Sequence, residues 1–225
     1  MAAGGVRVGE VIAEVMLLGL AVAASPFPII PAILLLFTPR ARATSLGFLA
    51  GWVIGIVVGT GLFIALATAI EKLDEPPTWA SWTRMVLGVL LLILGVLRWR
   101  NRRAQQEIPA WMQSIDGTTP AKALRLGVLL SAANPKVLLL AGAAGLAIGS
   151  AQLTTAGIVL ATAAFTVVAS STVALPVLLY AVVGDRILVP LAGLRTWLQE
   201  NNAAVMSVVI TVIGAVLLVK GIGGL

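Results

Sequence analysis

The sequence contains no cysteine and no histidine among its 225 residues. This absence excludes disulfides, thiol redox relays, zinc sites built on Cys or His, and acid–base catalysis by an imidazole. No Gly-rich phosphate loop of the Walker type is present, so the chain itself does not use ATP. Carboxylates within the apolar segments are scarce. The sequence therefore predicts no enzyme, no metal site and no cofactor.

Charge is also scarce, because only 11% of the residues are charged against about 25% in a soluble domain. Hydrophobic residues make up 60% of the chain, and its mean hydropathy is +1.06. They occur in runs of about 20 or more, the length a helix needs to cross the hydrocarbon of a bilayer. These features predict an all-α membrane protein. The net charge of +6 then indicates cytoplasmic anchors and not nucleic-acid binding.

Six apolar segments are expected to cross the membrane, at residues 11–37, 44–70, 85–97, 123–148, 153–183 and 203–219. Three lie on each side of a basic polar connection, so we divide the chain into 1–97, 98–122 and 123–225. An odd number of spans per half inverts the second half relative to the first. The predicted fold is six transmembrane helices in two inverted three-helix repeats, a layout common in secondary transporters.

Proline interrupts the first segment of each repeat. A proline lacks the amide N–H and clashes with the carbonyl four residues back, so it kinks or breaks a helix. Backbone freed at membrane depth is tolerated only where it is buried in protein or lines a watery cavity. Broken segments at corresponding places in two halves point to a transporter's binding site. The candidate substrate-binding residues are Ser25, Pro26, Pro28, Asn134, Pro135 and Lys136.

Lys136 is the only basic residue expected inside a span. It either snorkels to the interface or faces a cavity, where its ammonium would attract a carboxylate or phosphate. Glu14 and Asp185 are candidate counter-ions and coupling carboxylates. For Glu14, the competing interpretations are an interfacial position and a water-filled vestibule.

Small and hydroxylated residues mark two other segments. Gly47, Gly51, Gly55 and Gly59 form one helical stripe, which fits close packing within the chain or the seam of a homodimer. In the fifth segment, the hydroxyls of 170–172 either bond carbonyls freed by a nearby proline or contact substrate.

The basic residues are unevenly divided between the two sides of the membrane. Ten lie in the loops after the first, third and fifth segments, four lie on the other side, and Lys136 completes the fifteen. The excess marks the cytoplasmic face, so both termini are expected outside. Within this excess, four arginines form either a simple stop signal or a site for anionic lipid headgroups: Arg98, Arg100, Arg102 and Arg103.

The motifs Ala24-Ser25-Pro26-Phe27-Pro28 and Ser131-Ala132-Ala133-Asn134-Pro135-Lys136, with the glycine stripe and the Arg-rich connection, resemble the GAP proteins over nearly the whole chain. These are addressing proteins for peptidoglycolipid and sulfolipid within the lysine-exporter superfamily. The resemblance implies inverted three-span repeats. It also implies movement of an anionic cell-envelope glycolipid, or its precursor, across the inner membrane of an actinobacterium-like cell.

Two alternatives stay open beside lipid transport. One is proton-coupled export of a small solute such as an amino acid, which is also found in the superfamily. The other is a non-transporting scaffold that positions lipid-export machinery in the membrane. The lack of cysteine argues against the superfamily's thiol electron carriers, and the lack of soft ligands argues against its heavy-metal exporters.

Overall fold

The structure is a computed structural model that describes residues 2–70, 89, 92–93, 96–97, 100, 117–194, 196–197, 207, 211, 215 and 218. The predicted spans 85–97 and 203–219 lie largely outside these residues, so they stay predictions. The described part is all-helical, with six α-helices and one 3-10 turn. Their bounds are α1 Ala2–Ala23, α2 Pro26–Leu35, α3 Ala41–Ile70, α5 Pro120–Ala132, α6 Pro135–Gly149, α7 Thr155–Val183 and η2 Gly184–Ile187.

Two helical stretches, Ala41–Ala69 and Thr155–Leu194, are long and apolar enough to cross a membrane by themselves. Two further spans arise if each bent pair counts as one. The α1–α2 pair bends by 62° and the α5–α6 pair by 66°. The prediction of a multi-pass helical membrane protein is confirmed, and the two bent pairs lie at the two predicted breaks.

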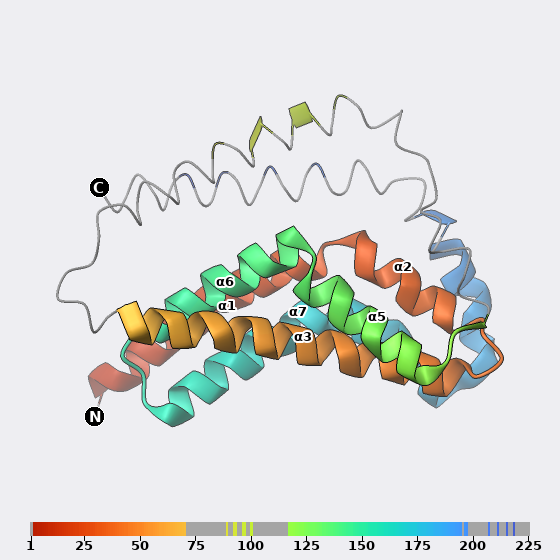
Figure 1. Cartoon of the computed structure of the whole chain (residues 1–225), viewed down its shortest axis with the longest axis horizontal. Coiled ribbons are helices and arrows are strands. Elements are labelled where there is room, and N and C mark those ends of the chain that lie inside the picture. The colour runs from red at the N-terminus through yellow and green to blue at the C-terminus, as the bar shows by residue number, and fades with distance from the viewer. Residues whose placement is uncertain are drawn as a thin grey trace.

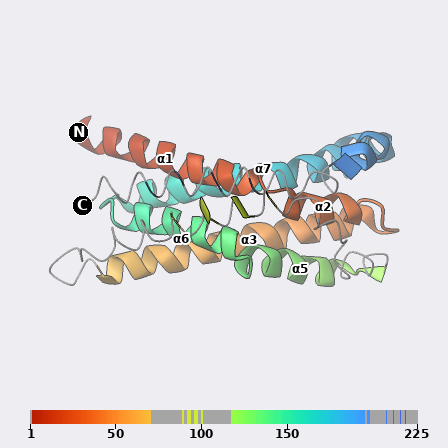
Figure 2. The same cartoon turned by 90° about the horizontal axis from the view of Figure 1, so that it is seen from above.

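The helices form an elongated bundle whose long axis most of them follow (Figures 1 and 2). Figure 1 shows α1 and α2 running from the end that holds the N-terminus to the opposite end, where the chain turns into α3. The α5–α6 pair runs back the other way, alongside α3. The two broken helices are therefore antiparallel to each other, as an inverted relation between the halves requires.

Each broken helix packs beside the long helix of the other half. The α1–α7 pair and the pair of α3 with α5 have the most extensive contacts in the bundle. Along each pair of helices, the residues in contact keep a constant difference in residue number, so the two helices run parallel. In the first, Val8 lies by Gly157, Gly19 by Val168 and Ala23 by Thr172; in the second, Gly47 lies by Pro120, Gly51 by Leu124 and Gly55 by Val128.

The glycine stripe makes the second pairing possible. A Cβ at Gly47 would lie 2.7 Å from the carbonyl oxygen of Pro120, and one at Gly51 would overlap the carbonyl of Leu124. The close approach is mutual, because a Cβ at Gly127 on α5 would overlap the carbonyl of Phe48 on α3. Only glycine lets two helix backbones approach this closely. Close packing within the chain is confirmed, since α5 covers Gly47, Gly51 and Gly55. The possible homodimer stays a prediction and would need another surface.

Candidate substrate site at the paired helix breaks

The two breaks have the same local construction. Ser25 is extended, with φ −78° and ψ 121°, and Asn134 has φ −78° and ψ 114°. A proline follows each as the first residue of the next helix, where its missing N–H costs no helical hydrogen bond and its fixed φ is already helical. The residue before a proline avoids the α region. Sequence chemistry therefore dictates both the place and the shape of each break.

The first break is closed by hydrogen bonds. The amide of Ser25 donates to the carbonyl of Val22 at 3.0 Å. The hydroxyl of Thr172, on α7, donates to the carbonyl of Ala23 at 2.8 Å. Ser25 is fully buried. These contacts satisfy backbone that a continuous helix would have paired internally, and the bond from Thr172 links the first break to α7 of the other half.

That contact also decides how the hydroxyls of α7 are used. The expected target was a carbonyl freed by Pro176, within α7 itself. Thr172 instead reaches across to the other half of the chain, while Ser171 donates to the carbonyl of Val168 at 2.8 Å. The expected bond to a carbonyl freed by Pro176 is therefore not the one that Thr172 makes, because its hydroxyl bonds a carbonyl of α1.

The second break is more open than the first. Asn134 caps α6, since its side-chain oxygen accepts from the amide of Lys136 at 3.1 Å. A Cβ at Gly59, the next glycine along α3, would lie 3.9 Å from the Cβ of Ala141 on α6. Ala132 and Ala133 are both exposed.

Lys136 supplies the most unusual group at this break. Its ammonium nitrogen is buried and has no hydrogen-bond partner in the part of the chain that the structure describes. A charge at the centre of a bilayer costs about 2.5–3.5 kcal/mol even on the insertion scale. Buried polar groups are almost always paired, so an unpaired ammonium indicates a position kept for water or for an anion.

The dipoles of two helices add to the positive charge of the Lys136 ammonium. Both α2 and α6 begin at a break near the middle of the bundle and run toward opposite ends (Figures 1 and 2). Helix α6 also contacts α1, which leads into the other break. Each helix N-terminus carries about half a positive elementary charge. Two such termini and one ammonium give the breaks a positive potential that would favour a negatively charged group.

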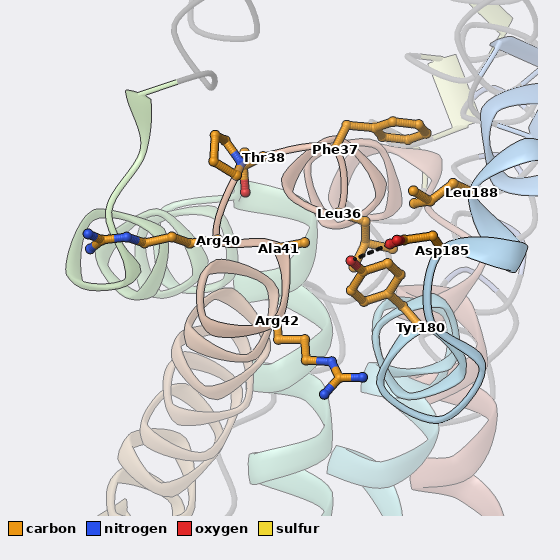
Figure 3. A pocket seen from close by; sticks show the side chains of 10 residues that line it. Leu36, Phe37, Thr38, Arg40, Ala41, Arg42, Tyr180, Asp185 and Leu188 are labelled. Atoms are coloured by element: carbon orange, nitrogen blue, oxygen red, sulfur yellow. Dashed lines mark hydrogen bonds between the residues drawn. The ribbon is translucent and has the colours of Figure 1, made fainter.

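The other candidate residues lie elsewhere or are less informative. Pro28 is buried within α2, and Pro135 is exposed at the start of α6. Glu14 is half-buried on α1, nine residues and about 14 Å before its end. Asp185 is not brought to Lys136, because it lines a cavity where α2 turns into α3 at one end of the bundle (Figure 3).

Of the four arginines in the basic connection, Arg100 is helical and exposed. The other three, Arg98, Arg102 and Arg103, lie outside the described residues. Headgroup binding by this group stays a prediction.

Sequence reasoning missed other buried polar atoms without a partner. Those of Trp52, Thr60 and Thr162 have none in the described structure. The hydroxyl of Ser170, one of those singled out from the sequence, has none there either. The available signal was a tryptophan in the middle of a span, since this residue normally marks the membrane interface. Trp52 is fully buried instead. Such atoms are expected to be met by water or ligand in the working protein.

Comparison with protein families gives one match that covers both breaks. The family is described as Sap, sulfolipid-1-addressing protein, and its model matches residues 15–223. The chain belongs to this family. The resemblance to addressing proteins, drawn from the two motifs, is thereby confirmed over most of the chain. The family is described as an addressing protein and not as an enzyme. No curated protein and no solved structure matches the chain.

Proposed function

We propose that the protein is a transporter that moves an anionic cell-envelope lipid, or its lipid-linked precursor, across the inner membrane. The observation that carries the proposal is the buried, unpartnered ammonium of Lys136 at the N-terminus of α6. The family's description, which refers to a sulfolipid, supports the choice of an anionic lipid as cargo. A sulfate or phosphate would supply the charge that this position lacks.

The proposed architecture completes the described bundle with two more spans. Residues 85–97 and 203–219 supply the third helix of each inverted repeat, and 98–122 joins the repeats. The antiparallel broken helices and the exchanged packing of the halves support this layout. The end that holds Arg40, Arg42 and Lys122 faces the cytoplasm, since cytoplasmic loops carry the basic excess. Both termini then lie outside.

The breaks also suggest how access alternates between the two faces. Residues at element ends absorb large backbone changes in hinge motions. Asn134 is such a residue, and the proposed movement rotates α6 about it. The first break, fixed by the bond from Thr172 to the carbonyl of Ala23, acts as the stationary counterpart. Glu14, half-buried on α1, is the candidate carboxylate for coupling to protons.

The test is lipid movement in reconstituted vesicles. The probe is a sulfated glycolipid with a fluorescent headgroup-side label, and its exposure is followed with an impermeant quencher, with and without a proton gradient. Lys136→Met and Asn134→Ala are expected to reduce movement at least tenfold, and Lys122→Met, which alters an exposed lysine, should leave it unchanged. Wild-type movement by the first two variants would refute the site and favour a scaffold. Movement of labelled lysine without movement of lipid would favour an amino-acid exporter.

A further inference from the structure

A second concave site lies at the end of the bundle, away from the helix breaks. It is a cavity of about 580 Å³ between the turn of residues 36–42, which joins α2 to α3, and the end of α7 with η2 (Figure 3). Ligand pockets usually measure about 300–1,000 Å³. The cavity therefore has room for a headgroup, and its position at the end of the spans puts it at the depth of lipid headgroups.

The wall formed by the turn is held by hydrogen bonds. The hydroxyl of Thr38 donates to the carbonyl of Leu35 at 2.7 Å and lies 2.9 Å from the hydroxyl of Thr44. The hydroxyl of Thr44 in turn donates to the carbonyl of Arg40 at 3.0 Å. Both threonines are buried. This network fixes a turn that would otherwise be mobile, so the cavity is a built feature of the fold.

The proposal uses two kinds of polar group in the cavity: the hydrogen-bonded pair of Tyr180 and Asp185, and the guanidinium of Arg42. The hydroxyl of Tyr180 donates to Oδ1 of Asp185 at 3.0 Å, and Figure 3 shows the two side chains pointing toward each other inside the cavity. This bond orients the carboxylate and leaves its lone pairs on Oδ2 for another donor. Arg42 also lines the cavity, and Figure 3 shows its side chain extending past Tyr180, away from the carboxylate of Asp185. Within residues 2–70 and 117–194, Arg42 takes part in no salt bridge, so its guanidinium is available.

The combination of these groups limits the chemical class of ligand that fits the cavity. A carboxylate accepts hydrogen bonds and never donates when ionised, so Asp185 favours a ligand with hydrogen-bond donors such as hydroxyls. A guanidinium prefers sulfate, phosphate or carboxylate oxygens. A simple anion would be repelled by Asp185, and an uncharged sugar would leave Arg42 unused. The apolar side chains of Phe37 and Leu188, on the opposite side of the cavity, suit the start of an acyl chain.

We propose that this cavity binds a sugar that carries an anionic ester, with Asp185 accepting from the sugar hydroxyls and Arg42 holding the ester. The ligand source is the headgroup of a glycolipid or a free sugar ester of the same chemistry. This inference takes the cytoplasmic orientation of the cavity from the proposed function. The cavity would then be a loading site at the cytoplasmic end of the bundle, separated from the first break by helix α2. It is separate from Lys136, so each site fails or holds by itself.

The experiment measures equilibrium binding to the full chain in micelles by native mass spectrometry. The probes are sulfatide, which has hydroxyls and an anion, galactosylceramide, which has hydroxyls only, and phosphatidic acid, which has an anion without sugar hydroxyls. Wild-type protein should prefer sulfatide by at least tenfold over both. Arg42→Gln should lower sulfatide affinity about tenfold to a hundredfold and leave galactosylceramide unchanged, since hydrogen bonds to charged groups contribute about that factor.

The second variant gives a change of opposite sign that misfolding cannot produce. Asp185→Asn removes the negative charge, so it should strengthen phosphatidic acid binding while it weakens binding of galactosylceramide. Lys122→Met, at an exposed lysine that does not line the cavity, is the control and should leave all three affinities unchanged. Glucose 6-sulfate, added as a soluble competitor of sulfatide, distinguishes the two ligand sources. If it displaces sulfatide with an affinity equal to that of sulfatide, the ligand is a free sugar ester. If it displaces sulfatide only weakly, the ligand is a lipid. Unchanged sulfatide affinity in both Arg42→Gln and Asp185→Asn would overturn the proposal, whatever the result of transport assays.

Discussion

Replacing Lys136 by methionine should make the protein more stable and abolish transport. Methionine keeps the length and the apolar stem of lysine and removes only the ammonium. In the structure this ammonium is buried and lacks a partner among the described residues. A residue that lowers stability in the resting protein is expected at a site that is completed only by its cargo.

The size of the gain follows from two terms. An ionised group at the bilayer centre costs about 2.5–3.5 kcal/mol on the insertion scale, and less where water reaches it. Repulsion from the positive N-terminus of α6 adds about 0.3–1 kcal/mol. Partial access to water offsets some of both, so we expect Lys136→Met to raise the free energy of unfolding by about 2 kcal/mol. For a chain of this length that corresponds to a Tm higher by roughly 4–8 °C.

The measurement is thermal unfolding in micelles, paired with lipid movement in vesicles made from the same preparation. Lys122→Met is the matched control, because Lys122 is exposed on α5 and its replacement should alter stability by less than about 0.5 kcal/mol. Added sulfated glycolipid should raise the Tm of wild-type protein and should raise that of Lys136→Met less.

Two results would refute this reasoning. If Lys136→Met lowered the Tm, its ammonium would be making a stabilising contact. If the variant matched wild type in both stability and transport, Lys136 would simply snorkel to the interface. The first result would require another explanation for the buried nitrogen, and the second would remove it from the site.

Three other predictions test the packing and the topology. Thr172→Val should lower the unfolding free energy by about 0.6–1.7 kcal/mol in chemical denaturation, because the carbonyl of Ala23 loses its donor; no loss would mean that the bond is not formed. Gly51→Ala should destabilise by about 1–3 kcal/mol through overpacking against α5, whereas Gly61→Ala, whose Cβ meets no described atom within 4 Å, should be neutral or better in the same unfolding experiment. Lys122→Cys, the only thiol in that variant, should resist an impermeant reagent in intact cells; labelling from outside would invert the topology.

The sequence alone determined where the helices break and how they begin again. Proline cannot donate a hydrogen bond and restricts the residue before it, so Ser25 and Asn134 had to be extended wherever the chain folded. Local chemistry of this kind acts within a few residues and needs no tertiary partner. The same holds for the length and polarity of the long apolar helices, since the bilayer sets both. The two motifs around the breaks also sufficed to indicate the family.

Only the tertiary structure decided what each break faces. Thr172 is 149 residues from Ala23, and no local pattern says that its hydroxyl caps that carbonyl and not one in its own helix. The glycine stripe left two uses open, of which close packing within the chain was favoured, and the structure shows α5 lying against most of it. Asp185 could have been the partner of Lys136, and the fold instead turns it toward Tyr180. Charge and hydroxyl groups act over a few ångströms, so their roles depend on which helices the bundle brings together, which sequence distance does not record.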